Sequence, residues 1–142
     1  MKRLLSMVLL LAACHGVRRP ATGAASPRGA VTNFLSAVRA QDLQAMSIAW
    51  GTDKGAARDV VDPKQIEKRE LVMVCYLGHD HYDIQSEAPA ENGQRVFHVA
   101  LTKGQITRST NFFVVKGPSD RWYVESVDIA PLSALCRSGS SG

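Results

Sequence analysis

The chain of 142 residues has no apolar run long enough to cross a membrane as a helix. Its longest apolar run, from Leu4 to Ala13, contains Ser6 and covers about ten residues, whereas a spanning helix needs about 20. A long basic stretch is missing too, because the 17 Lys and Arg are interspersed with 13 Asp and Glu. We therefore expect no binding of nucleic acid.

Motifs with a known chemistry are also missing. The segment Gly51-Thr52-Asp53-Lys54-Gly55 is flanked by glycines but lacks the spacing of a phosphate-binding P-loop. We find no coherent set of catalytic residues and no internal repeat, and we expect no cofactor. This leaves the two ends of the chain and the pattern of its elements as the informative features.

The N-terminus combines a basic start with a short apolar run and small residues. Lys2 and Arg3 precede the apolar run, which ends in Leu11-Ala12-Ala13-Cys14. A basic start and a short apolar stretch are typical of a secretory signal peptide. The final four residues resemble the lipobox of bacterial lipoproteins. That resemblance implies cleavage before Cys14 and a covalent lipid anchor on its thiol, with the membrane as a partner. The alternative is an ordinary signal peptide in which the cysteine is coincidental.

The resemblance also implies a location. The protein would be exported and held at the bacterial cell membrane by the lipid on Cys14. In proteobacteria an aspartate after the lipidated cysteine favours the inner membrane, and His15 stands there instead. We therefore expect the outer membrane if the bacterium is Gram-negative. Without Lys2 and Arg3 the net charge falls from +4 to +2.

Composition divides the chain into four parts. We expect a signal peptide over 1–13, a lipidated cysteine with a flexible tether over 14–29, one domain over 30–136, and a disordered low-complexity tail over 137–142. The tether is rich in Gly, Ala, Pro and Arg and has no apolar period. The domain is long enough to bury a single core.

The first half of the domain has the pattern of helices. Val31, Phe34, Leu35 and Val38 share one helical face. A second helix is expected after Asp42 as its cap, with Gly51 ending it, followed by a polar loop over 52–61. Asp62 and Pro63 predict a third helix up to Leu77, although the segment 71–74 is also compatible with a strand.

The second half has the pattern of strands, expected at about 79–88, 94–103, 106–116 and 121–129. Asn92-Gly93 predicts a two-residue hairpin turn, Gly104-Gln105 a second, and residues 117–120 a third. Helices followed by an antiparallel meander predict an α+β fold, with N-terminal helices packed on a curved, cone-like sheet of about four strands.

This order of elements resembles the nuclear transport factor 2-like superfamily, which includes ketosteroid-isomerase-like proteins. The segment from Val31 to Leu43 is similar to that family's opening helix and capped second helix, and Arg121-Trp122-Tyr123-Val124 to the last strand of its small lipoproteins. The resemblance implies a cystatin-like cone with an open end as its pocket. It implies little about activity, because the fold serves enzymes and binding modules alike.

Pairing the predicted strands about their turns assigns side chains to two faces. The first, which we expect the helices to cover, carries eight residues: Phe97, Val99, Leu101, Phe112, Val114, Tyr123, Val127 and Ile129. The second face carries a candidate interface, in which Phe113 lies opposite Val124 and Val115 opposite Trp122. Exposed, these four would form an interaction surface. We expect a homodimer or an envelope protein as the partner through this sheet.

The candidate pocket residues are Arg108, Tyr123 and Glu125. On the helix-covered face, Arg108 or Glu125 would be a ligand contact or an acid–base group if buried, and a wet rim residue otherwise. His79 and His81 could share one side of a strand, but His98 falls opposite Glu87 in this pairing and is too far away to be a third ligand. We therefore expect no metal site.

Two cysteines remain inside the domain. Cys75 and Cys136 form an even pair in an exported protein, where disulfides persist. The alternative is a buried Cys75 with a free thiol at Cys136.

The main functional hypothesis is a lipid-anchored envelope protein whose domain is a binding or assembly module. The alternatives are a small-molecule enzyme with acid–base chemistry in the cone and an inert structural spacer.

Overall fold

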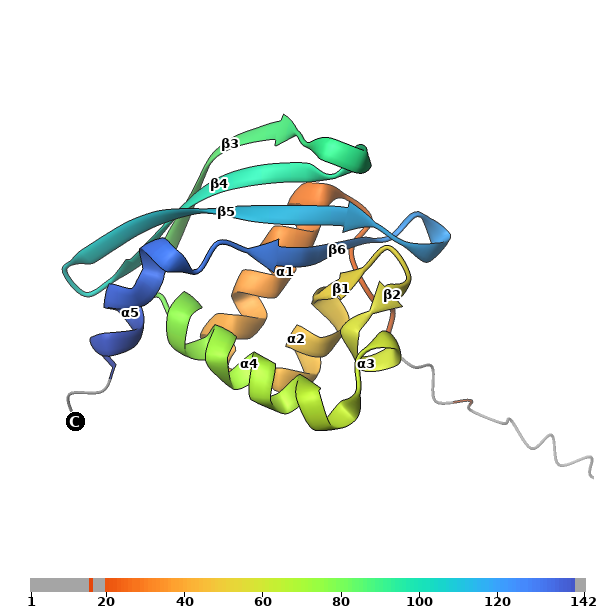
Figure 1. The fold of residues 1–142 in the computed structure, drawn as a ribbon, viewed down its shortest axis with the longest axis horizontal. Helices are drawn as coiled ribbons and strands as arrows, with labels where there is room; N and C mark the ends of the chain where they lie inside the picture. The colour runs from red at the N-terminus through yellow and green to blue at the C-terminus, as the bar shows by residue number, and fades with distance from the viewer. Residues whose placement is uncertain (1–15, 17–19, 140–142) are drawn as a thin grey trace, which may run out of the picture.

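A computed structural model describes residues 16 and 20–139 of the chain. The predicted signal peptide and the predicted lipidation at Cys14 lie outside the described residues. Helices come first and an antiparallel sheet follows (Figure 1). The predicted α+β class is confirmed, and the open sheet fits a curved, cone-like arrangement.

The helices begin at residues suited to capping. The described helices are α1 (Pro27–Ala40), α2 (Leu43–Ala49), α3 (Ala57–Val60), α4 (Pro63–Leu77) and α5 (Ser133–Arg137). The side chains of Ser26, Asp42 and Asp62 accept hydrogen bonds from backbone amides in the first turns of α1, α2 and α4, which otherwise lack partners. The predicted caps at Asp42 and Asp62 are confirmed, and segment 71–74 is helical.

The main sheet is an antiparallel meander in chain order, formed by β3 (His81–Pro89), β4 (Arg95–Lys103), β5 (Ile106–Lys116) and β6 (Trp122–Val127). The polar loop expected over 52–61 instead contains a short hairpin, β1 (Gly51–Thr52) with β2 (Gly55–Ala56), and then α3. Helix α5 follows the sheet and was not expected. The polar and small residues of these short segments gave no periodic pattern that would predict them.

The core lies between the sheet and the helices. Figure 1 shows α1 running beneath the sheet, and α1 packs on both β5 and β6. Phe34 of α1 meets Phe112 of β5 edge to face, with ring centroids 6.5 Å apart, a favourable aromatic geometry. The fully buried side chains include Val31, Leu35, Met46, Leu77, Phe97 and Leu101. Large side chains therefore fill the space under the middle of the sheet.

Strand pairing follows the prediction at one hairpin and departs from it at two. The pairing of β4 with β5 about Gly104-Gln105 is as predicted. The other two turns contain three residues each, η1 (Glu91–Gly93) and η2 (Pro118–Asp120), in place of an even number. The strands they join are consequently shifted by one residue, so that Lys116 lies opposite Trp122.

This shift reverses the faces of Trp122, Tyr123 and Val124, because side chains alternate along a strand. The irregularity that follows places Val127 opposite Phe112, so Val127 packs on the core as predicted. Val124 lies opposite Val114 and is buried in the core, and Phe113 lies opposite Ser126. The predicted pairs Phe113–Val124 and Val115–Trp122 are therefore wrong. Trp122 and Val124 belong to the helix-covered face, and Tyr123 points to the other face.

The segment before α1 is part of the domain. Ala24 exchanges backbone hydrogen bonds with Trp122, at N···O distances of 2.9 and 2.8 Å, and so extends the sheet beyond β6. Arg121 also donates to the carbonyl oxygens of Thr22 and Gly23. The expected tether over 14–29 is therefore too long at its C-terminal end, because residues 22–29 pair with β6 or start α1. Small residues there allow close approach, which composition alone does not distinguish from a linker.

Candidate functional site

The three predicted pocket residues do not meet in one cavity. Arg108 is exposed on β5 and donates from Nη1 to the Thr107 carbonyl oxygen at 2.8 Å. Glu125 is half-buried at the irregularity in β6 and accepts a hydrogen bond from Gln94 Nε2. Tyr123 is buried in a small cluster with Ala56 and Val115. Arg108 is therefore a solvent-exposed residue, the alternative given above for a pocket contact. Glu125 is held by the side chain of Gln94.

Tyr123 supports the packing of the N-terminal segment and the β1–β2 hairpin. Its hydroxyl group hydrogen-bonds with Thr22 Oγ1 at 2.8 Å. Gly23, Gly51 and Gly117 approach its ring so closely that a Cβ atom on any of them would lie within 2.9 Å of a ring carbon. Tyr123 therefore has a structural role, because it joins the N-terminal segment, the β1–β2 hairpin and the turn before β6.

The predicted interface residues are distributed over both faces. Val124 is 1% and Val115 8% exposed, whereas Phe113 and Trp122 are half-buried. Trp122 packs partly against the main core, with Lys116 Nζ 5.7 Å from its ring centroid. On the outer face, Phe113 lies opposite Val96, and the hydrogen-bonded pair His98 and Asn111 comes next along the two strands. The sheet therefore lacks the four-residue apolar patch that the shifted pairing predicted.

The histidines are also separated. His79 is buried before β3, where its Nδ1 lies 2.8 Å from the Leu77 carbonyl oxygen and its ring meets Tyr82 edge to face. Burial lowers its pKa. His81 is exposed at the start of β3, and His98 lies opposite Ser86. Among the described residues, no group of three or more His, Cys, Asp and Glu side chains could hold a metal ion.

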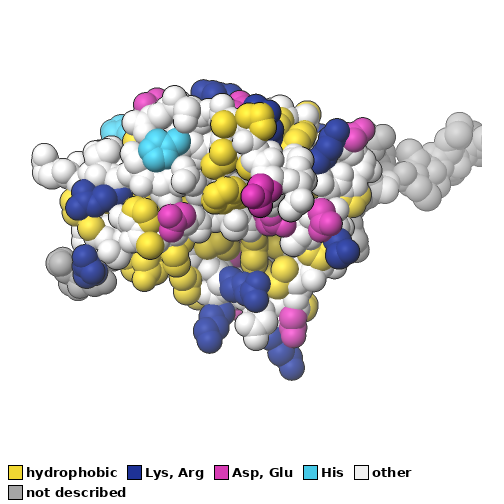
Figure 2. Space-filling view, turned by 45° about the horizontal axis from the view of Figure 1, so that its top comes forward, with side chains coloured by type: hydrophobic (Ala, Val, Ile, Leu, Met, Phe, Trp, Pro, Cys, Tyr) yellow, Lys and Arg dark blue, Asp and Glu magenta, His cyan; other side chains and the backbone are white. Residues whose placement is uncertain are grey.

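A concave, largely apolar surface follows the outer side of α4. Leu71 and Val72 are 55% and 45% exposed there, unlike most large apolar side chains of the domain. They line a groove of about 580 Å³, here called the α4 groove, together with other residues of α4 and one of α5: Lys64, Glu67, Lys68, Cys75, Tyr76 and Cys136. Figure 2 shows hydrophobic side chains in the hollow between the sheet layer and the projecting Lys and Arg side chains.

Basic side chains dominate the rim of the α4 groove. Lys64 and Lys68 line the groove and are exposed one helical turn apart, and Arg69, exposed next to Lys68 in the sequence, does not line it. Glu67 is the acidic residue of the lining. An apolar floor beside a mainly basic rim suits a ligand that is apolar in one part and negative in another.

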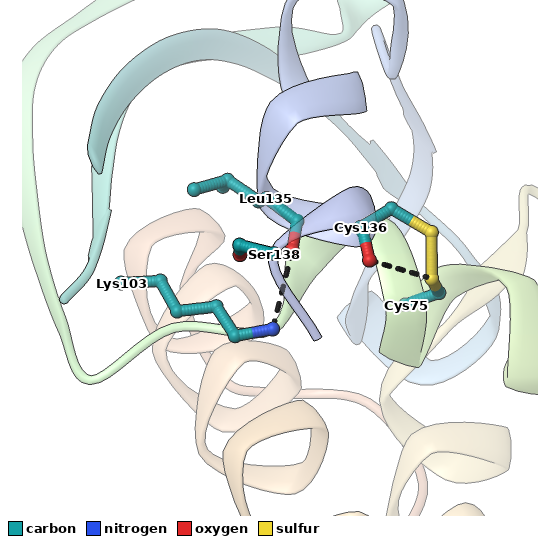
Figure 3. Close-up of a disulfide and its surroundings, with 5 residues drawn as sticks. All are labelled: Cys75, Lys103, Leu135, Cys136 and Ser138. Carbon is teal, nitrogen blue, oxygen red and sulfur yellow. Dashed lines mark hydrogen bonds between the residues drawn. A yellow bond between two sulfur atoms is a disulfide. The ribbon is translucent and has the colours of Figure 1, made fainter. Parts of the chain in front are cut away.

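A disulfide forms part of the lining of the α4 groove. Cys75 on α4 is bonded to Cys136 on α5, with a Cα–Cα distance of 4.7 Å (Figure 3), which lies within the usual range. The predicted disulfide is present. Lys103 Nζ donates to the Leu135 carbonyl oxygen at 3.2 Å, and Leu135 is fully buried. The disulfide holds α5 to α4 and Lys103 holds it to the end of β4, so the groove has a rigid wall.

Sequence reasoning missed the α4 groove although part of its signal is visible. Leu71 and Val72 lie off the helical stripe that Ile66, Met73 and Leu77 form, and so are apolar residues on the exposed side of a predicted helix. The part of the groove that the sequence did not indicate is α5, because a five-residue helix has too few turns to show a helical period.

No protein-family model matches the chain, no curated protein is significantly similar, and no solved structure matches its fold at a significant level. Within residues 16 and 20–139, no helix is long and apolar enough to cross a membrane.

Proposed function

We propose that this chain is a lipid-anchored bacterial envelope protein whose α+β domain is a binding module, and that the α4 groove is its binding surface. The anchor is supported by the basic start, the short apolar run and the lipobox-like residues Leu11 to Cys14. The observation that carries the binding role is the pair of exposed apolar side chains, Leu71 and Val72, beside a basic rim.

The ligand that fits this surface is an anionic membrane surface. Burial of Leu71 and Val72, each about half exposed, in an acyl layer would stabilise the bound state by on the order of 2 kcal/mol. Each Lys or Arg near anionic lipid adds about 1 kcal/mol, and Glu67 offsets part of this contribution from the basic rim. The sum corresponds to a dissociation constant of roughly 1 mM.

Such weak affinity is effective only if the domain is held close to the membrane. Among the described residues, Thr22 is the first whose side chain hydrogen-bonds with the domain, so at most residues 15–21 lie between Cys14 and that contact. Seven extended residues span at most about 25 Å. A tether of this length gives an effective concentration in the millimolar range, which matches the affinity expected for the α4 groove.

The alternatives receive less support. The enzyme hypothesis requires Arg108 or Glu125 in a closed cavity, and Arg108 is exposed while Glu125 is bound by Gln94. A homodimer through the sheet requires the predicted apolar patch, two of whose four members are buried in the monomer. The spacer hypothesis does not account for exposed apolar side chains on α4.

Vesicle binding tests the proposal. The chain from residue 15 onward retains every contact of the described domain and lacks the anchor. We expect it to sediment with vesicles of equal parts phosphatidylglycerol and phosphatidylcholine at millimolar lipid, and less as salt increases. Leu71→Ser should weaken binding by about fivefold, and Lys68→Gln by a similar factor.

Ile129→Ser is the matched control, because Ile129 is 38% exposed and does not line the groove. This variant should bind as the parent does. Equal binding of the parent to pure phosphatidylcholine vesicles, or no effect of Leu71→Ser, would overturn membrane docking. Absence of any vesicle binding at millimolar lipid would instead favour an envelope protein as the occupant.

A further inference from the structure

Helix α4 carries an acidic residue on its buried side. Glu70 lies one helical turn after Ile66 and one before Met73, both of which pack on the main core, and only 2% of its surface is exposed. Its Oε1 atom has no hydrogen-bond partner among the described residues. Burial of a carboxylate without a partner is unfavourable, so an unsatisfied group of this kind needs an explanation.

Glu70 lines a second cleft beside α4, and Glu67 lies on the border between this cleft and the α4 groove. This cleft, here called the Glu70 cleft, has a volume of about 430 Å³ and is enclosed by α2, α3 and α4. Its lining contains polar residues and a short apolar stretch: Leu43, Gln44, Ser47, Arg58, Pro63, Ile66, Glu67 and Glu70. The volume is sufficient for a small organic molecule.

The charges in the Glu70 cleft favour a positive ligand. Two carboxyl groups, Glu67 and Glu70, lie three residues apart on α4. Burial, and then repulsion by Glu67, raises the pKa of Glu70 to about 7. The lining also contains one cationic side chain, Arg58. Its Nε atom lies 3.6 Å from Oδ1 of Asp59 on the same helix, so this ion pair offsets part of its positive charge. α2 supplies only the uncharged Gln44 and Ser47.

We propose that the Glu70 cleft binds a small organic ammonium ion. The ammonium group donates to the Glu70 carboxylate where this side chain lines the cleft, and Glu67 adds a second attractive charge. A short hydrocarbon part of the ligand contacts Leu43, Pro63 and Ile66. A metal ion fits less well, since no described group of three acidic, His or Cys side chains converges there. An anion would meet two carboxyl groups.

Calorimetry with n-butylammonium chloride tests this assignment on the chain from residue 15 onward at pH 7. We expect saturable binding with one site, and binding of n-butanol at least tenfold weaker, since it has the same hydrocarbon part and no charge. Because a cation favours the carboxylate form, binding should release about half a proton per site. Titrations in two buffers with different ionisation enthalpies measure this release.

Variants locate the site. Glu70→Gln keeps the shape and removes the charge, and should weaken butylammonium binding at least tenfold and abolish proton release. Glu67→Gln, at an exposed position that tolerates change, should weaken binding several-fold. Glu91→Gln, in the exposed turn η1, is the control and should bind as the parent does. Equal affinity for butanol, no proton release by the parent, or unchanged binding by both Glu70→Gln and Glu67→Gln would overturn the proposal.

Discussion

At residue scale, Glu70 shows how the environment sets the chemistry of a side chain. The carboxyl group occupies a position that the helical period reserves for apolar residues, with Leu77 two turns further on. Removal from water favours the protonated form, and the negative charge of Glu67 adds to this effect. The group therefore binds a proton in the folded chain at pH values where it would be ionised in the unfolded chain.

This proton affinity predicts how stability depends on pH. The pKa of Glu70 rises from 4.5 to about 7 on folding, so the folded state binds more protons between these values. The free energy of unfolding should fall as pH rises through this window. Urea unfolding at pH 5 and pH 7.5 should show a larger loss of stability for the parent than for Glu70→Gln.

The loss of stability of the parent is compared with that of Glu70→Gln because His79, present in both proteins, changes stability with pH in the opposite direction. Its pKa is lowered by burial, so its contribution to stability is present above about pH 6.5 and is lost as pH falls. Parallel pH profiles for the parent and Glu70→Gln would contradict the raised pKa of Glu70.

The sequence contained enough information for the caps and the helical stripes but not for this cleft. Asp42 and Asp62 precede apolar periods and cap the expected helices. Glu70 could have been recognised as a polar residue on the stripe of Ile66 and Leu77. The surroundings of Glu70 could not have been recognised, because α3 and the β1–β2 hairpin come from a segment whose apolar residues show no helical or strand period.

At the scale of elements, two three-residue turns determine which side chains the sheet presents. Asn92 and Gly93 have φ values of 53° and 75°, and Ser119 and Asp120 have 57° and 56°. Asn92-Gly93 indicates a turn, but sequence does not distinguish two residues from three, and one residue reverses a face. The strand positions were predictable to within a few residues, whereas the outer surface of β6 was not.

The link between α4 and α5 gives a prediction about stability. The Cys75–Cys136 bond closes a loop of 61 residues, for which the chain-entropy model gives about 4 kcal/mol of stabilisation. The variant with both cysteines replaced by serine should lose about 2–4 kcal/mol in urea unfolding. The parent, denatured without reductant, should weigh about 2 Da less than the dithiol.

Reduced parent protein is the matched control, because it lacks the bond but keeps both sulfur atoms. It should unfold close to the double serine variant. Equal stability of the oxidised parent and the double variant would contradict a stabilising role for the bond.

At the scale of the whole molecule, a short N-terminal connection and one packed domain determine what the protein can reach. Small residues that predict a tether over 22–29 instead pair with β6 and pack around Tyr123. Composition could not reveal this, since glycine and alanine serve linkers and close contacts equally well. The shorter connection keeps the α4 groove near any membrane that holds Cys14.

The anchor itself gives the prediction at this scale. Cys14→Ser offers no thiol for the lipid, so the variant should incorporate no labelled fatty acid and should not be processed at position 14. The variant with both Cys75 and Cys136 replaced by serine is the control, since it keeps Cys14 and leaves no unpaired thiol in the domain. Equal labelling of Cys14→Ser and the parent would contradict lipid anchoring.

The most direct test of the central proposal measures whether residues of the α4 groove insert into the acyl layer of the membrane in the anchored protein. The lipidated chain carrying Leu71→Trp is placed in phosphatidylglycerol vesicles with brominated acyl chains, which quench tryptophan on contact. Emission added by Leu71→Trp, relative to the parent with Trp50 and Trp122, should be quenched, whereas emission added by Ile129→Trp should not. Equal quenching at both positions, or quenching at position 129 alone, would contradict docking through α4.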